Sequence, residues 1–394
     1  MAEHANLLYD SISPNTGDIA IGIAGQQLFE GLGVRSSVVD PFSDRDVGPL
    51  VIGGGELIRE TGDPFYDRFR RKGNHILNAA GVWTSATDLG YLNDYAFVSA
   101  RSSRELQVLK EFVPGAELMP CATTMLESPH FEIPGVEKDE PVVGIHLVPH
   151  SLRLIDRLAP LINAIPHKKV FIPFTHYNGD KSFMKSLPFD WSNSVVLDEL
   201  EPLELHSVIG QMKYVVVSSL HASIFAYSQN VPFASVYQKK AHYYFDDRQL
   251  ADHVVANEGQ LTTLLRRLEN EKFDFRPQVA EDRRAIEKAF RTYRDLLGGA
   301  GAQETAPPES EVPSLPRDRI LLQQAQQVLG DRDLVLAYSE HRLDDARRTI
   351  EILEEDNRKK QAEIDLFENS RTRRLQRRYA GLRLSISRLF RRSQ

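Results

Sequence analysis

Cysteine is nearly absent from the sequence, because Cys121 is the only one among 394 residues. One thiol cannot form an internal disulfide, which excludes a disulfide-stapled scaffold and fits a reducing compartment. The first residues also lack the basic region and the apolar run of a signal peptide. We therefore expect a cytoplasmic protein that is not exported.

A long apolar run suited to a membrane span is also missing. Residues 215–237 contain no Asp, Glu, Lys or Arg, but they include five serines, Asn230 and Pro232. Such polar groups and helix breakers are unfavourable in a bilayer. We interpret this segment as buried structure of a soluble domain.

Residues 371–394 lack acidic residues and lysine but hold nine arginines, whereas the whole chain has a formal net charge of -7. The body is therefore acidic and nucleic acid is not expected as a partner, because its binding normally needs a basic surface. The tail mixes its arginines with apolar residues such as Leu375 and Tyr379. This pattern suits peripheral attachment to the anionic inner face of a membrane. A solvated tail, or one that binds protein partners, would look the same.

Hydrophobic residues make up 41% of the chain, enough to bury the cores of two domains plus an extension. Short apolar runs alternate with helical patterns in two series, which predicts an α/β fold with two parallel sheets. Strands are expected at residues 5–11, 34–40, 49–52, 75–79, 95–100 and 116–119, and then at 142–147, 169–174, 194–197, 214–217 and 233–236. Helices are expected at residues 18–32, 103–112, 203–212, 261–268 and 279–297.

These patterns divide the chain into five parts. Residues 1–138 and 139–298 are expected to form two Rossmann-like domains around a cleft, with ligands at the carboxyl ends of the strands. Residues 299–316 are a linker rich in Gly, Pro, Ala and Glu. A coiled coil is predicted at 317–368 and a basic amphipathic tail at 369–394.

The coiled coil is predicted from a heptad repeat. Six aliphatic residues and one asparagine recur every seven residues, at Leu322, Leu329, Leu336, Leu343, Ile350, Asn357 and Ile364. This spacing is typical of a seam between helices, so we expect a homo-oligomer in which Asn357 helps to fix the register. Gly330 weakens the early part, and a single helix packed on the body is the alternative.

Two segments that follow strands in the first half are candidates for ligand binding. Asn15, Gly17 and Asp18 stand at a predicted helix start, where backbone amides and the helix dipole can bind an anion. A turn with Asp18 as a helix cap would have the same sequence. The other segment is a run of three glycines, Gly53, Gly54 and Gly55. It permits the close approach of a ligand, or simply a tight turn.

The second half offers two more segments. Ser218, Ser219 and His221 lie between a buried strand and a helix, where they could bind an anion and place His221 as an acid or base. A capped helix with a hydrogen-bonded histidine is the alternative. Lys240 follows the next strand and could neutralise a phosphate or a carboxylate. No Cys or His cluster has metal-ligand spacing, so no metal is expected.

Together these four segments resemble the polysaccharide pyruvyl transferase family over about residues 5–250, most specifically at Ser219-Leu220-His221 with Val231-Pro232 downstream. The resemblance implies two Rossmann-like halves similar to a B-type glycosyltransferase fold. It also implies transfer of pyruvate from phosphoenolpyruvate to paired sugar hydroxyls as a ketal. The acceptor would be a cell-surface glycan or a lipid-linked oligosaccharide precursor, and no cofactor is implied.

The resemblance makes His221 the acid/base candidate. His176, just after a predicted strand, is a second one. Such a site also needs fixed positive groups around phosphate and carboxylate. The substrate-binding candidates are Asn15, Gly17, Asp18, Gly53, Gly54, Gly55, Arg101, Ser218, Ser219 and Lys240.

This chain departs from the family pattern at three places. Many members carry Arg where Ser219 stands, Asp where Ser102 stands, and a Pro-Asp-Pro-like element where Pro120-Cys121-Ala122 stands. Two other functions stay open. One is a sugar-nucleotide-dependent glycosyltransferase on the same fold. The other, which these departures favour, is an inactive binding module in glycan assembly.

Overall fold

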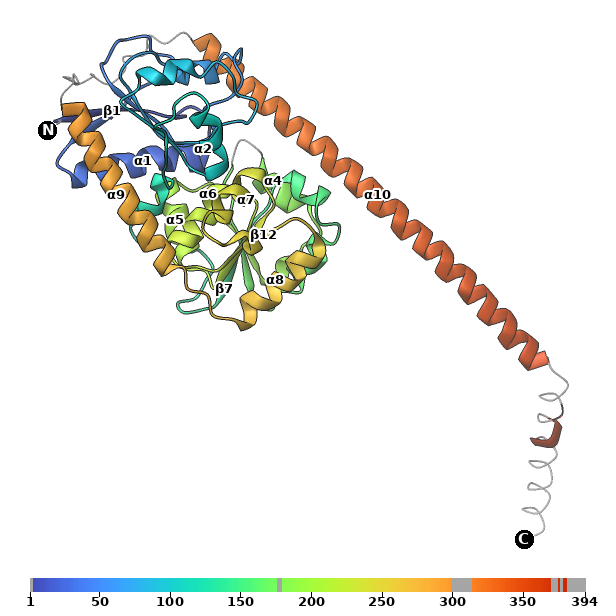
Figure 1. Cartoon of the computed structure of the whole chain (residues 1–394). Helices are drawn as coiled ribbons and strands as arrows, with labels where there is room; N and C mark the ends of the chain where they lie inside the picture. Colours follow the sequence, from blue (N-terminus) through green and yellow to red (C-terminus); the bar gives the residue numbers. More distant parts are fainter. Residues whose placement is uncertain (1–2, 176–178, 299–313, 370–374, 376–377, 381–394) are drawn as a thin grey trace. The chain divides into compact units, whose positions relative to one another are not determined.

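The computed structural model describes residues 3–175, 179–298 and 314–369, together with Leu375 and residues 378–380. Its first half, which begins with the blue segments of Figure 1, holds a six-stranded parallel sheet. The strand order is β2-β1-β3-β4-β5-β6. The strands are β1 (His4–Leu8), β2 (Arg35–Val38), β3 (Leu50–Gly53), β4 (Ile76–Ala80), β5 (Phe97–Ala100) and β6 (Glu117–Leu118). The helices of this half are α1 (Thr16–Gly31) and α2 (Ser103–Lys110).

The second half repeats this architecture with the strand order β12-β11-β10-β7-β8-β9, again with parallel pairs. Its strands are β7 (Val142–His146), β8 (Lys168–Phe171), β9 (Ser194–Val196), β10 (Tyr214–Val217), β11 (Phe233–Val236) and β12 (Val254–Val255). Its helices are α3 (Leu158–Asn163), α4 (Asp180–Ser186), α5 (Pro202–Gly210), α6 (Leu220–Ser228), α7 (Lys239–Asp246) and α8 (Glu258–Asn270). The predicted fold of two Rossmann-like halves is therefore confirmed.

Each sheet has one point where the strand order reverses direction. In the first sheet it lies between β1 and β3, and in the second between β7 and β10. The connections that follow the two neighbouring strands at this point run to opposite faces of the sheet. A crevice therefore opens at the carboxyl ends of these strands. The segments after β1, β3 and β10 carry most of the candidate residues, while Arg101 follows β5 and Lys240 follows β11.

The strand predictions succeeded where both faces of a strand are buried. Residues 214–217 and 233–236 match β10 and β11, whose residues are all buried. Several other predicted strands were too long, because apolar residues continue into buried loops; β8, for example, ends at Phe171 although Ile172 and Phe174 are also buried. The two-residue strand β12 was not predicted.

Helix α9 (Arg276–Gly298) joins the two halves. Its side chains reach the first sheet and α1: Phe290 packs on Phe29 with ring centres 5.1 Å apart, and the Tyr293 hydroxyl bonds to the Asn78 side chain at 3.2 Å. The short 3-10 helix η3 (Ala122–Met125), in the connection between the halves, contacts α1, α6 and α9. These contacts fix the first half against the second.

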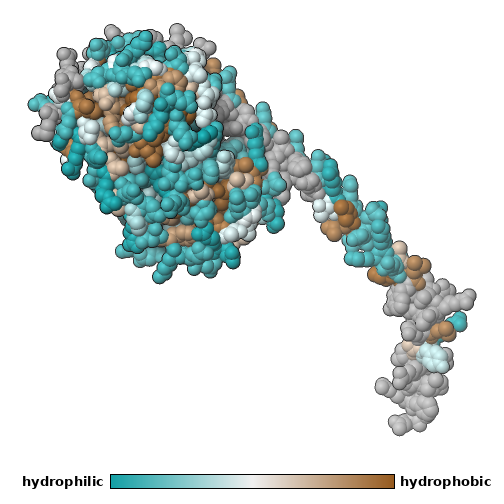
Figure 2. Space-filling view, in the orientation of Figure 1, coloured by the Kyte–Doolittle hydropathy of each residue, from teal (hydrophilic) through white to brown (hydrophobic). Residues whose placement is uncertain are grey.

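Helix α10 (Ser314–Asn369) begins three residues before the predicted coiled coil and passes through Gly330. Residues from Asp333 onward form a second compact unit. The six aliphatic residues of the heptad repeat are each more than half exposed, and Figure 2 shows apolar side chains recurring along this helix. Most of the predicted linker and tail lies outside the described residues. Within the described residues, no helix is long and apolar enough to cross a membrane.

Candidate active site

Two of the candidate sequence segments meet across the interface between the halves. The His221 ring, at the start of α6, lies directly against Gly17 at the start of α1. A Cβ atom on Gly17 would stand 2.0 Å from His221 Nδ1, so only glycine leaves room for the imidazole. The helix starts after β1 and β10 therefore converge on His221.

The His221 side chain is buried, and its Nε2 atom has no hydrogen-bond partner among the described residues. Burial, with the positive charges of Arg101 and Lys240, holds the pKa of His221 well below its ordinary value. The imidazole is therefore neutral at physiological pH when no anion is bound. A neutral ring with an unpartnered nitrogen can accept a proton, and an anion bound beside it would favour the imidazolium.

Arg101 follows β5 and is almost completely buried. Its guanidinium covers Gly81, where a Cβ atom would stand 2.2 Å from Nη2. Glu105, one helical turn further on in α2, accepts hydrogen bonds from Arg101 Nε and Nη2 at 3.3 Å each. Ser102, which replaces the aspartate of the family pattern, caps α2 and donates to Glu105 at 2.7 Å. Glu105 thus provides the carboxylate beside Arg101.

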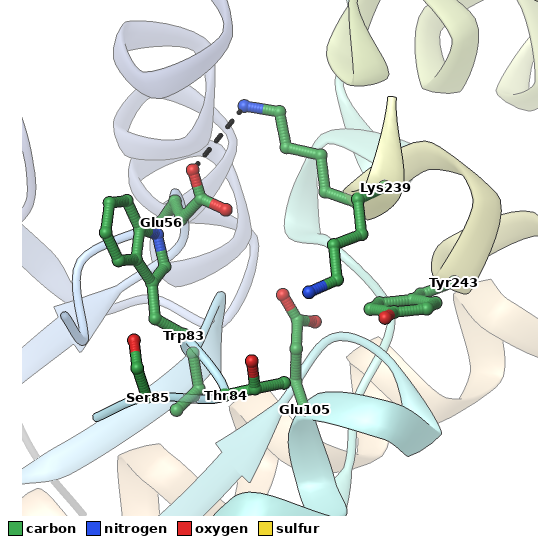
Figure 3. A pocket seen from close by; sticks show the side chains of 9 residues that line it. Glu56, Trp83, Thr84, Ser85, Glu105, Lys239 and Tyr243 are labelled. Carbon is green, nitrogen blue, oxygen red and sulfur yellow. Dashed lines mark ion pairs between the residues drawn. The ribbon is translucent and has the colours of Figure 1, made fainter. Parts of the chain in front are cut away.

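Lys240 and Arg101 both approach Glu56, which follows the three glycines at the end of β3. The Glu56 carboxyl lies 3.8 Å from Lys240 Nζ and 4.0 Å from Arg101 Nη2. Burial alone would raise the pKa of Glu56, but Lys240, Arg101 and Arg59 bring it below its ordinary value. The pair with Lys240, drawn in Figure 3, joins α7 of the second half to the first sheet.

The glycine run packs against α1. Gly53, Gly54 and Gly55 all have positive φ angles, which L-residues with a side chain rarely adopt. A Cβ atom on Gly55 would stand 2.6 Å from the Asp18 carboxylate, and one on Gly54 would stand 2.2 Å from Ile21. These glycines therefore bring the turn after β3 against the N-terminus of α1, as the tight-turn interpretation requires.

Asp18 lies in the first turn of α1, and Asn15 caps that helix and donates to Asp18 Oδ2 at 2.7 Å. Burial and the neighbouring Asp10 raise the pKa of Asp18 to about 7, although Lys240 and Arg101 oppose the shift. A carboxyl with this pKa exchanges its proton near neutral pH. The cap of α1 is Asn15 and not Asp18, so the alternative interpretation of Asp18 as a helix cap is wrong.

The two serines of the second half occupy different positions. Ser218 is buried at the end of β10, and its hydroxyl pairs with that of Ser151 at 2.7 Å. Ser219 caps α6, but its side chain makes no capping hydrogen bond. Neither serine carries a charge, so the positive charge that acts on His221 comes from Arg101 and Lys240.

His176, the second acid/base candidate, lies outside the described residues. At the end of the neighbouring strand β7, a different histidine is fixed in place. His146 bonds through Nε2 to Asp180 at 3.0 Å, and both side chains are buried. Asp180 also accepts from the backbone amides of Phe174 and Thr175 at 2.7 Å. This network holds the backbone of Phe174 and Thr175 after β8 and was not predicted.

Sequence reasoning also missed the two carboxylates of the cleft, Glu56 and Glu105. One signal was present for Glu105, since Arg101 and Glu105 stand four residues apart, the spacing of a helical ion pair. Glu56 directly follows the glycine run, but two of its partners, Arg101 and Lys240, lie far away in the sequence, so its position in the cleft was not predicted.

Comparison with solved structures finds distant similarity. A UDP-GlcNAc 2-epimerase from Methanocaldococcus jannaschii has a TM-score of 0.47 and 10% identity, covering 74% of this chain and 99% of its own. The glycosyltransferase SnogD from Streptomyces nogalater has a TM-score of 0.33 and 9% identity, covering 71% and 98%. An uncharacterized protein from Klebsiella pneumoniae has a TM-score of 0.38 and 13% identity, covering 64% and 90%.

Sequence comparison gives a sharper result. No curated protein matches the chain. The family model described as polysaccharide pyruvyl transferase, however, matches residues 15–239. This match runs from the helix cap Asn15 through Arg101 and His221 to the start of α7, and it covers more than half of the 394 residues. The chain therefore belongs to the polysaccharide pyruvyl transferase family.

Proposed function

We propose that the protein transfers pyruvate from phosphoenolpyruvate to two hydroxyls of one sugar, in a cell-surface glycan or its lipid-linked precursor, and forms a ketal. The observation that carries this proposal is the position of His221. Its unpartnered, buried Nε2 lies in the cleft that also holds Arg101 and Lys240, and both cations act on its pKa. An acid/base group beside two cations is what an anionic donor requires.

The donor carries a phosphate and a carboxylate, and the cleft offers positive groups for both. Arg101 and Lys240 provide full charges, while the N-termini of α1 and α6 meet beside His221 and add partial positive charge. Glu56 pairs with both cations. Lys240 is the more exposed of the two cations. A bound anion would therefore compete with Glu56 for Lys240.

The chemistry begins with protonation of the methylene carbon of phosphoenolpyruvate. Positive charge then develops at the neighbouring carbon, which one sugar hydroxyl attacks as it loses its proton. The bond from this carbon to the phosphate oxygen breaks, inorganic phosphate leaves, and the second hydroxyl closes the ketal. The two sugar hydroxyls lose two protons in total. One replaces the proton that was given to the methylene carbon, and the other leaves with the phosphate.

His221 can serve both kinds of proton transfer. As neutral imidazole it accepts a proton from a sugar hydroxyl, and when the donor anion raises its pKa it can give a proton to the methylene carbon. Asp18 is a second proton reservoir, because its pKa of about 7 leaves it partly protonated at neutral pH. We assign His221 the acid/base role and Asp18 a role in supplying or storing the proton.

The substitution at Ser219 is compatible with this function. Ser219 stands where many family members carry an arginine beside the Leu-His pair. Arg101 and Lys240, however, supply positive charge near His221 from two other parts of the chain and lower its pKa. These positive charges support an active site at this position rather than an inactive binding module.

A transfer assay tests the proposal. The wild-type protein is incubated with phosphoenolpyruvate and a panel of methyl glycosides and lipid-linked sugars, and released phosphate and product mass are measured. We expect phosphate release that depends on an acceptor, and a product heavier by one pyruvate less one water. The His221→Ala variant should lose both signals while its circular dichroism stays unchanged. Equal turnover by this variant would refute the role of His221.

A further inference from the structure

A pocket of about 260 Å³ opens between the two halves on the outer side of the Glu56 and Lys240 pair. Trp83, Thr84 and Ser85, in the loop after β4, form one wall, and Lys239 and Tyr243 of α7 form the other. Figure 3 shows Trp83 and Tyr243 on opposite sides of this space. The donor site proposed above uses Glu56 and Lys240 only at the inner end of the pocket.

Trp83 is an unusual residue in this position, because its large aromatic side chain remains 38% exposed. It is nevertheless firmly held. Its backbone amide donates to Ile58 at 2.9 Å, its indole is hydrogen-bonded to the Glu56 carboxyl, and the Arg59 guanidinium lies 4.7 Å from its ring centre. A rigid, exposed indole beside a pocket is typical of a surface that receives an apolar face of a ligand.

Polar groups suited to hydroxyls surround the indole. Thr84 and Ser85 are exposed, and their side chains make no hydrogen bond to another described residue. The carboxyls of Glu56 and Glu105 line the inner end. Hydroxyl groups on Thr84 and Ser85 can donate and accept, whereas an ionised carboxylate accepts from a ligand hydroxyl and forms a strong hydrogen bond.

The carboxylates of the pocket are paired with cations. Among the lining residues, Lys239 and Lys240 match Glu56 and Glu105 in number. Glu56 lies within 4.0 Å of Lys240, Arg59 and Arg101, and Glu105 pairs with Arg101. Such carboxylates can still accept hydrogen bonds from the hydroxyls of a ligand. An aromatic wall with these hydrogen-bonding partners fits a sugar ring.

We propose that this pocket is the acceptor subsite and that it binds a neutral pyranose, whose ring packs on Trp83 and whose hydroxyls bond to Glu56, Thr84 and Ser85. The assignment as an acceptor site rests on the proposed function, because Glu56 and Lys240 connect the pocket to Arg101 and His221. Donor and acceptor thereby enter the cleft from different sides, with the anion toward His221 and the neutral sugar toward Trp83.

The two tryptophans of the chain allow a direct test. Trp191 packs against Phe171 in the second half, with ring centres 4.8 Å apart, and does not line the pocket. Trp191→Phe therefore leaves Trp83 as the single fluorescent tryptophan, and Trp83→Phe leaves Trp191 as the matched control. Each variant is titrated with methyl glycosides of glucose, galactose, mannose and N-acetylglucosamine, with and without phosphoenolpyruvate.

We expect at least one glycoside to change the emission of the Trp191→Phe variant in a saturable way and to leave the Trp83→Phe variant unchanged. Trp83→Ala should weaken the binding of that glycoside at least about tenfold, since truncation of an aromatic anchor commonly has this effect. No response with any glycoside, or equal responses in both single-tryptophan variants, would overturn the proposal.

Calorimetry with phosphoenolpyruvate on the same variants separates this inference from the proposed function. Binding of phosphoenolpyruvate within about twofold of wild type in Trp83→Ala, with the glycoside signal lost, supports separate subsites. Donor binding without any glycoside response would refute the acceptor subsite and leave the proposed donor intact. A glycoside response without donor binding would refute the proposed donor but support a sugar site at Trp83.

Discussion

The contact between Gly17 and His221 leads to a quantitative prediction. A Cβ atom at position 17 would stand 2.0 Å from His221 Nδ1, whereas ordinary van der Waals contacts begin at about 3.4 Å. The Gly17→Ala substitution must therefore displace the imidazole, or separate α1 from α6, by more than about 1 Å. Overpacking of this kind costs about 1–3 kcal/mol of unfolding free energy.

A double-mutant cycle identifies the cause of this cost. His221→Ala removes the ring atoms nearest the new methyl group but keeps the Cβ atom, which would stand 2.8 Å from it, so Gly17→Ala should cost distinctly less in that background than in wild type. Gly31→Ala is the matched control, since it lies in the same helix and a Cβ atom there would have nothing within 4 Å. It should be neutral or slightly stabilising.

The assay is urea unfolding followed by circular dichroism, with phosphoenolpyruvate calorimetry on the folded variants. We expect Gly17→Ala to lose stability and donor affinity together, because the displaced imidazole no longer occupies its site. Additive costs in the double mutant would refute the contact. Donor affinity equal to that of Gly31→Ala would refute the link between the contact and the site.

Three further predictions concern charge and assembly. Arg101→Met should abolish donor binding and destabilise the protein by about 3–5 kcal/mol in urea unfolding, because it leaves Glu105 buried without its partner; a stable variant with normal donor affinity would contradict this. Asp18 has a pKa of about 7 in the folded protein, above its unfolded value, so ionising it destabilises the fold progressively as pH rises from about 4 to 7. Asp18→Asn should therefore equal wild type in stability near pH 4 and exceed it above pH 7, whereas a difference independent of pH would contradict the shifted pKa. If the heptad repeat pairs with a second copy of the chain, Leu336→Asp with Leu343→Asp should convert an oligomer to a monomer in light scattering; an unchanged molar mass would contradict the coiled coil.

Most of the fold was predictable because buried strands and helices have simple patterns of apolar residues in the sequence. Parallel strands covered on both faces consist of consecutive apolar residues, and residues 214–217 illustrate this directly. Helix α10 was predictable from its heptad repeat. Strand order was not predictable, since the order of parallel strands depends on contacts between residues far apart in the chain.

The candidate site was predictable in its parts and unpredictable in its assembly. Gly17 and His221 each stand in a recognisable segment, yet their contact joins residues from separate halves. The pKa of Asp18 is raised by burial and by Asp10 and opposed by Lys240 and Arg101, and the two cations come from distant parts of the chain. Trp83 lacks any local motif, because its importance comes from exposure beside a pocket.

The most direct test of the proposed function is calorimetric titration of phosphoenolpyruvate into wild type and His221→Ala, with a nucleotide sugar as competitor. We predict binding to wild type that is unaffected by the nucleotide sugar and at least about tenfold weaker in the variant, with both proteins equally folded. Equal affinity of the two proteins for phosphoenolpyruvate, or binding of the nucleotide sugar alone, would contradict the assignment of His221 and of the donor.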